Sequence, residues 1–83
     1  MSRSQKIRRA IEEDNLATYR GRYVGTPSQL AHLAGAAYST IKNAYVKCKV
    51  RTYLLAGSGI LIDAMELAIY FENARRGRPP KAV

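Results

Sequence analysis

The sequence has few of the residues on which small catalytic and metal sites depend: it holds one cysteine, one histidine and no tryptophan among 83 residues. The single cysteine, Cys48, excludes an intrachain disulfide, and with His32 it is too little for a structural zinc site. No Ser/His/Asp set, glycine-rich phosphate loop or metal-ligand spacing can be assembled from the other residues. We therefore expect a single domain that is not an enzyme and needs no cofactor.

Acidic residues are also scarce, with 6 Asp and Glu against 14 Lys and Arg, for a formal net charge of +8. This imbalance predicts a polyanionic partner, either nucleic acid or an anionic membrane surface. The longest apolar stretch, Ile60 to Phe71, is interrupted by Asp63 and Glu66 and is too short to span a bilayer, and no signal peptide is visible. We expect a cytoplasmic protein without a membrane partner.

The apolar residues repeat with helical spacing almost throughout, which predicts an all-α bundle of about four to five helices. Ser4 would cap a first helix whose apolar stripe runs from Ile7 to Ala17, followed by a loop at 20–25. A last helix is expected from Ile60 to Ala74, capped by Ser58. Residues 47–53 fit a short strand, a hairpin arm or a frayed helix end equally well.

The middle of the chain has the layout of a helix-turn-helix, two short helices joined by a tight turn that contains glycine. Thr26 and Pro27 are typical of a helix start, Gly35 is typical of a helix stop, and a second helix follows from Tyr38 or Ser39 to Val46 or Lys47. Small or apolar side chains occupy the positions where the two helices must pack, namely Leu30, Ala31, Ala34, Ile41 and Ala44.

The segment from Thr26 to Tyr45 resembles the helix-turn-helix of small phage and plasmid repressors of the lambda-repressor-like kind, with a weaker similarity to plasmid Kor-type repressors. In that family the second helix enters the major groove and its N-terminal residues contact base edges. The resemblance implies a sequence-specific repressor of transcription that binds double-stranded DNA in the bacterial cytoplasm, in association with the nucleoid, with no small-molecule ligand. The implied base-reading residues are Tyr38, Ser39, Thr40, Lys42 and Asn43.

The distribution of charge supports the same partner. Residues 27–53 contain four basic and no acidic side chains, and they include the whole second helix. Asn43 can pair with adenine and Lys42 with guanine, whereas basic residues beyond the helix can follow the phosphates. The predicted phosphate-binding residues are Thr26, Ser28, Gln29, Lys47, Lys49 and Arg51.

The last predicted helix has more apolar residues than one buried stripe needs, which favours a twofold homodimer on a palindromic operator. The residues assigned to dimerisation are Ile60, Leu61, Ala64, Met65, Leu67, Ala68 and Phe71. The alternative is that this helix belongs to the core of a single chain.

The chain ends in a basic segment at 75–83, which we expect to be a flexible tail on a domain of residues 1–74. Four of its residues resemble the core of an AT-hook, which lies in the minor groove of A·T-rich DNA: Arg76, Gly77, Arg78 and Pro79. This leaves two alternative functions open. One is a nucleoid-type protein that prefers A·T-rich DNA, and the other is a protein-interaction module, such as an antitoxin or inhibitor, whose basic face meets an acidic protein.

Overall fold

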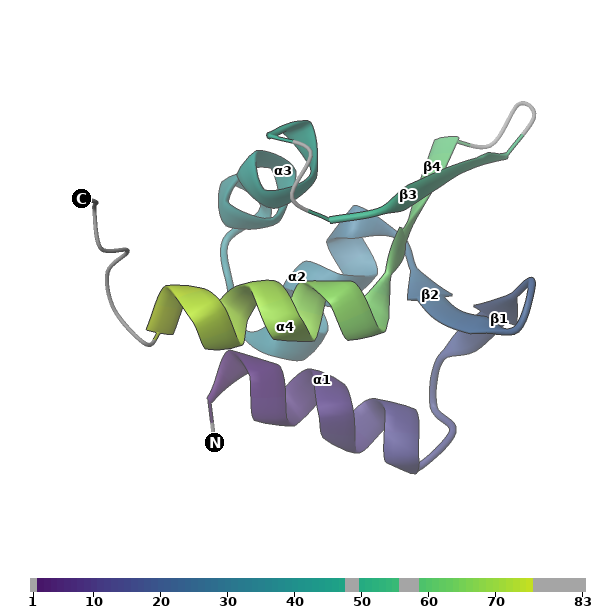
Figure 1. Ribbon diagram of the computed structural model, residues 1–83, viewed down its shortest axis with the longest axis horizontal. Coiled ribbons are helices and arrows are strands. Elements are labelled where there is room, and N and C mark those ends of the chain that lie inside the picture. Colours follow the sequence, from purple (N-terminus) through teal and green to yellow (C-terminus); the bar gives the residue numbers. More distant parts are fainter. Residues whose placement is uncertain (1, 48–49, 56–58, 76–83) are drawn as a thin grey trace.

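The structure is a computed structural model that describes residues 2–47, 50–55 and 59–75. These residues form four helices and four strands, in which a pair of strands precedes and follows the pair of helices α2 and α3 (Figure 1). In order they are α1 (Arg3–Glu12), β1 (Ala17–Tyr19), β2 (Arg22–Gly25), α2 (Pro27–Ala34), α3 (Tyr38–Val46), β3 (Thr52–Leu55), β4 (Gly59–Asp63) and α4 (Ala64–Arg75).

The expected all-α bundle is wrong, because the strands form one antiparallel sheet and the fold is mixed α/β. The strand order is β1-β2-β4-β3, so the two sequential hairpins join through the pairing of β2 with β4. That central pairing is short, with Val24 opposite Asp63 and Gly25 opposite Ile62. The β3–β4 hairpin therefore extends beyond the rest of the sheet, as Figure 1 shows at the upper right.

Helix α1 begins and ends earlier than expected. Its N-cap is Ser2, whose Oγ accepts a backbone N–H at 3.2 Å, so the predicted cap, Ser4, lies inside the first turn and is buried. The helix ends at Glu12, just before Asp14 adopts a left-handed conformation with a φ of 59°. Asp is one of the few non-glycine residues that take this conformation readily. The predicted extension of the helix to Ala17 is therefore wrong.

The predicted loop at 20–25 is largely a β-hairpin. Arg20 and Gly21 form its two-residue turn, with φ values of 55° and 81°. Two consecutive positive φ values are what a type I′ turn requires, and its twist matches the twist of paired strands. Threonine, tyrosine and valine side chains in the flanking residues favour the extended backbone. The alternating pattern was too short to be separated from the helical pattern that precedes it.

The helix predicted from Ile60 begins at Ala64 instead, because residues 59–63 form β4. Asp63 marks the boundary, since its Oδ1 accepts the backbone N–H of Glu66 at 3.1 Å and so caps α4. The predicted cap, Ser58, lies outside the described residues. A continuous run of apolar residues has no period that separates a buried strand from a buried helix, which explains the error.

The core lies where the four helices meet the inner face of β4. α4 packs lengthwise against α1, and the two run side by side in Figure 1. The buried side chains come from every helix, so a single chain covers most of the apolar surface of α4. They include Ile7 and Ala10 of α1, Leu30, Ala31 and Ala34 of α2, Ile41 and Ala44 of α3, Ile62 of β4, and Ala64, Leu67, Ala68 and Phe71 of α4.

Candidate nucleic-acid interface

Helices α2 and α3 and the turn between them lie where the sequence predicts them. Thr26 caps α2, Pro27 is its first residue, and Gly35 ends it with φ 69° and ψ 34°. The left-handed glycine lets the Ala36 N–H return to the Ala31 carbonyl at 3.0 Å, which closes the turn. The two helices therefore form a helix-turn-helix in which α3 is held against the core.

Helix α3 has one buried face and one exposed face. Ile41 and Ala44 have no exposed surface and fix the helix to the core. The opposite face carries residues at positions i, i+3, i+4 and i+7, which lie in one row along a helix. We call this row the outward stripe; its members are Ser39, Lys42, Asn43 and Val46, and all four are exposed.

The predicted base-reading residues thus divide into two groups. Ser39, Lys42 and Asn43 lie on the outward stripe, whereas Thr40 is half-buried at its side. Tyr38 is half exposed, but it interacts with Tyr45 on the side of α3 that contains Ile41. Burial and this interaction raise the pKa of Tyr45. Tyr38 therefore lies at the edge of the exposed face.

Val46 is the residue on this face that the sequence reasoning missed. Val46 is 56% exposed, and it continues the row of Ser39, Lys42 and Asn43. The helical spacing that assigned Lys42 and Asn43 to this face extends to Val46 and could have assigned it as well.

Two of the predicted phosphate-binding side chains take part in capping α2. Thr26 Oγ1 accepts the Gln29 N–H at 3.1 Å, and Gln29 Oε1 accepts the Thr26 N–H at 3.4 Å. This reciprocal pair satisfies two backbone donors that would otherwise lack partners at the helix start. Ser28 is exposed between them, and Lys47 is exposed at the end of α3. Lys49 lies outside the described residues.

Arg51 is held by a carboxylate of α4. Its backbone N–H donates to Glu66 Oε1 at 3.0 Å, and its guanidinium Nε lies 3.6 Å from Glu66 Oε2. The guanidinium is still exposed, so Arg51 can reach a phosphate only in competition with a carboxylate. We therefore expect Arg51 to contribute less to phosphate binding than an unpaired arginine would.

Asp63 is fully buried and joins three strands to the start of α4. Its Oδ2 accepts Arg22 Nε at 2.9 Å and the Tyr53 hydroxyl at 3.0 Å, while Oδ1 caps α4. Burial alone would raise the pKa of the Asp63 carboxyl, but the bonds from Arg22, the Glu66 N–H and Tyr53 outweigh it. The pKa of Asp63 is therefore lowered, and its charge fastens the β3–β4 hairpin to β2.

Most carboxylates of the described residues are matched with arginines. Four of the chain's six acidic residues form ion pairs with arginines. None of these pairs involves α2 or α3. The pairs are Arg8–Glu72, Arg9–Glu13, Arg22–Asp63 and Arg51–Glu66.

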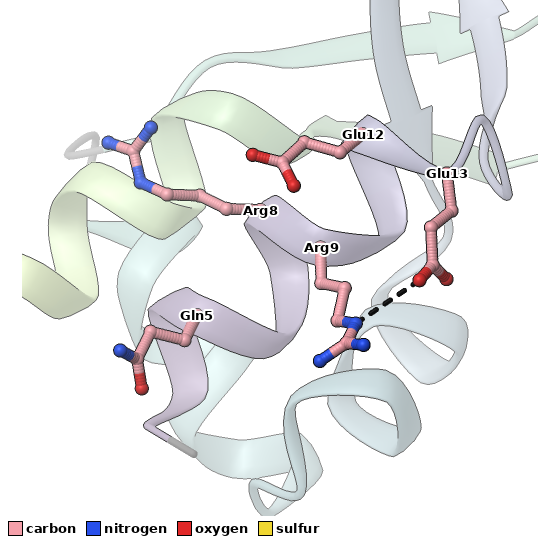
Figure 2. A pocket seen from close by; sticks show the side chains of 5 residues that line it. All are labelled: Gln5, Arg8, Arg9, Glu12 and Glu13. Atoms are coloured by element: carbon pink, nitrogen blue, oxygen red, sulfur yellow. Dashed lines mark hydrogen bonds and ion pairs between the residues drawn. The ribbon is translucent and has the colours of Figure 1, made fainter.

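A shallow depression on the outer face of α1 is shown in Figure 2. Its lining carries charges of both signs, and Arg9 Nε lies 3.1 Å from Glu13 Oε2. Arg8 donates two hydrogen bonds to Glu72 of α4. Because these arginines already face carboxylates, this surface is poorly suited to a polyanion. The five lining residues are Gln5, Arg8, Arg9, Glu12 and Glu13.

The residues assigned to dimerisation lie mainly inside the chain. Ala64, Leu67 and Ala68 have no exposed surface, and Phe71 is 6% exposed, so these four cannot form the surface of an interface. Met65 is half-buried beside Arg8. Ile60 and Leu61 are half-buried in β4 and belong to no helix. The predicted tail residues Arg76, Gly77, Arg78 and Pro79 lie outside the described residues.

Comparisons with protein-family models, curated proteins and solved structures find no match for this chain. Within the described part of the chain, no helix is both long and apolar enough to cross a membrane. The same residues contain no group of three His, Cys, Asp or Glu side chains that could hold a metal ion.

Proposed function

We propose that this chain binds double-stranded DNA and reads its sequence with the outward stripe of α3, acting as a repressor of transcription. The observation that carries the proposal is the exposure of Ser39, Lys42 and Asn43 in one row on the second helix of a helix-turn-helix. This helix lies within a 27-residue segment, 27–53, that has no acidic residue. A repressor of this kind would work in the bacterial cytoplasm, in association with the nucleoid.

The chemistry of the three side chains suits base edges in the major groove. An asparagine amide can donate to and accept from adenine, a lysine ammonium can donate to guanine, and a serine hydroxyl can do either. Ile41 and Ala44 have no exposed surface and pack α3 against the core. The backbone that carries the outer side chains of α3 is therefore fixed. A rigid backbone favours sequence-specific contacts, because little conformational entropy is lost on binding.

The β3–β4 hairpin provides a second exposed surface. The hairpin and α3 both lie on the side of the molecule opposite α1 in Figure 1, and Leu54 of β3 is 78% exposed. Two-stranded ribbons fit DNA grooves as helices do. We propose that this hairpin lies along the DNA beside the segment read by α3. The bonds of Asp63 with Arg22 and Tyr53 fix the hairpin to the rest of the sheet.

The proposed form on DNA is a homodimer on a palindromic site. Because Ala64, Leu67, Ala68 and Phe71 are buried within the chain, the interface must use other residues. Sedimentation of the protein with and without a palindromic site tests this part of the proposal. A monomer at micromolar concentration in both conditions would rule out the homodimer without affecting the reading of DNA by α3.

The central test is selection of binding sites from a random pool of double-stranded DNA, followed by titration at physiological salt. We expect the selected site to bind better than a scrambled one, and Asn43→Ala to lose roughly 1–3 kcal/mol of that preference at one base pair. Asn73→Ala, which removes an exposed asparagine from α4, is the matched control and should retain the preference. Equal binding of selected and scrambled DNA by the unaltered protein would refute the proposal.

The nucleoid-type alternative is separated by removing residues 76–83. If binding depends mainly on the tail, this truncation removes most of the affinity and any preference for A·T-rich DNA. Under our proposal, the truncated protein binds more weakly but still prefers the selected site. Binding of an acidic protein, with no affinity for DNA, would favour the interaction-module alternative.

A further inference from the structure

The outward stripe of α3 ends in an apolar side chain, Val46, that follows three polar ones. It is 56% exposed, more than Ile69 of α4 at 43%. Its neighbours on the stripe, Lys42 and Asn43, are the residues to which the proposed function assigns base contacts. A valine at this place adds no donor, acceptor or charge, so its contribution to such a surface has to be apolar.

The length of the stripe determines how much DNA it covers. The seven steps from Ser39 to Val46 span about 10 Å of helix, which corresponds to about three base pairs. Lys42 and Asn43 lie one turn before Val46. If these two reach base edges, Val46 faces the next base pair along the groove.

The major groove offers one apolar group at base edges, the C5 methyl of thymine. We infer that Val46 reads thymine by packing its methyl groups against that C5 methyl, which makes it a specificity-determining residue of α3. This inference rests on the proposed function and extends it, because it states that the recognised site has a thymine beside the bases read by Lys42 and Asn43. The absence of acidic residues in 27–53 favours DNA as the partner of this exposed valine.

The test removes first the C5 methyl of thymine and then the methyl groups of Val46. Each thymine of the selected site is replaced in turn by deoxyuridine, which lacks only the C5 methyl, and binding is titrated with the unaltered protein and with Val46→Ala. We expect one thymine in each half-site whose replacement weakens binding about three- to fourfold. Val46→Ala should bind the thymine site more weakly by a similar factor and should not respond to that replacement.

Ile69→Ala is the matched control, since it trims an exposed apolar residue on α4. This variant should keep the full response to deoxyuridine. Thermal unfolding of Val46→Ala, a substitution at an exposed site, should match that of the unaltered protein.

Two results would overturn the inference while leaving the proposed function in place. In the first, no thymine replacement changes binding, although Lys42→Ala still weakens it. In the second, Val46→Ala weakens binding to thymine and deoxyuridine sites by the same factor, which assigns Val46 to another contact. Failure to select any preferred site would overturn both the inference and the proposed function.

Discussion

Helices α1 and α3 both expose positive charge, but two arginines of α1 are matched within the chain. On α1, Arg8 reaches Glu72 and Arg9 reaches Glu13, so these two positive charges face carboxylates of the same chain. At α3, Lys42 and Lys47 are exposed, and neither forms an ion pair with a described residue. The excess positive charge at α3 is therefore available to a partner.

The difference shows that the net charge of the chain is a poor guide to where a polyanion would bind. Arginines contribute most of the matched charge, and their planar guanidinium groups suit the carboxylates that hold the helices and hairpins together. Lys42 of α3 and Lys47, which directly follows α3, are exposed and take no part in the core. Position relative to the carboxylates thus separates charges that hold the fold from charges that can bind DNA.

Reversing one charge on each helix tests the difference between α1 and α3 most directly. Lys42→Glu and Arg9→Glu change the net charge by the same amount. We expect Lys42→Glu to weaken binding to the selected DNA about a hundredfold, because a base contact worth roughly 1–3 kcal/mol is replaced by repulsion from phosphates. Arg9→Glu should weaken it only a few-fold, through the overall field of the protein.

Fluorescence anisotropy with labelled DNA measures both affinities under one set of conditions. Thermal unfolding of each variant shows whether the fold is retained. If the two substitutions weaken binding equally, the distinction between the faces of α1 and α3 is wrong, and the protein responds only to its total charge.

The second prediction concerns a charge that holds the fold. Asp63→Asn keeps the shape of the side chain and its ability to cap α4, but it removes the negative charge facing Arg22. We expect the free energy of unfolding to fall by about 2 kcal/mol, since hydrogen bonds to a buried charge are lost. Glu72→Gln, in the half-exposed pair with Arg8, should lower it by less than about 1 kcal/mol. Urea unfolding measures both.

The stability contributed by Asp63 should also depend on pH in a defined direction. Its pKa is lowered in the folded chain, so this stability is fully present above the unfolded pKa, about 3.9, and is lost as pH falls through the folded pKa. The unaltered protein should therefore lose more stability on acidification below about pH 4 than Asp63→Asn does. Parallel stability curves for the two proteins would show that Arg22 and Tyr53 do not hold the ionised carboxyl.

The sequence predicts the helix-turn-helix better than any other part of the fold because its signals are local. A cap at Thr26, a proline at position 27 and a left-handed Gly35 each act within one turn of the chain. The exposed positions of α3 then follow from the 3.6-residue period, given that Ile41 and Ala44 must be buried.

The sheet was missed because its determinants are long-range or ambiguous. β2 pairs with β4 across almost forty residues, and no local pattern encodes that pairing. The signal for the start of α4 was present as Asp63 followed by Glu66, a capping pattern placed within an apolar run. The burial of α4 by α1 is likewise a tertiary property, and for this reason the sequence pattern predicts a dimer interface at residues that belong to the core.

The third prediction concerns the turn through which α1 and the helix-turn-helix meet. A Cβ added at Gly35 would lie 3.1 Å from Lys6 Nζ of α1, and the φ of 69° disfavours any L side chain. Gly35→Ala should therefore destabilise the protein by about 1–2 kcal/mol, whereas Gly35→Asn should lose less because asparagine tolerates this conformation. Urea unfolding distinguishes them. An equal loss of stability for both variants would show that the contact with Lys6, and not the backbone conformation, causes the destabilisation.

The smallest expected difference between α1 and α3 is in the salt dependence of DNA binding. A lysine that neutralises a phosphate releases a counterion, so Lys47→Ala should reduce the slope of log affinity against log salt by about 0.9. Arg9→Ala should leave the slope unchanged, because Arg9 faces Glu13 on the other side of the molecule. Titrations between about 50 and 200 mM salt measure both slopes. An unchanged slope for Lys47→Ala, with a reduced slope for Arg9→Ala, would show that DNA binds at α1 and not at α3.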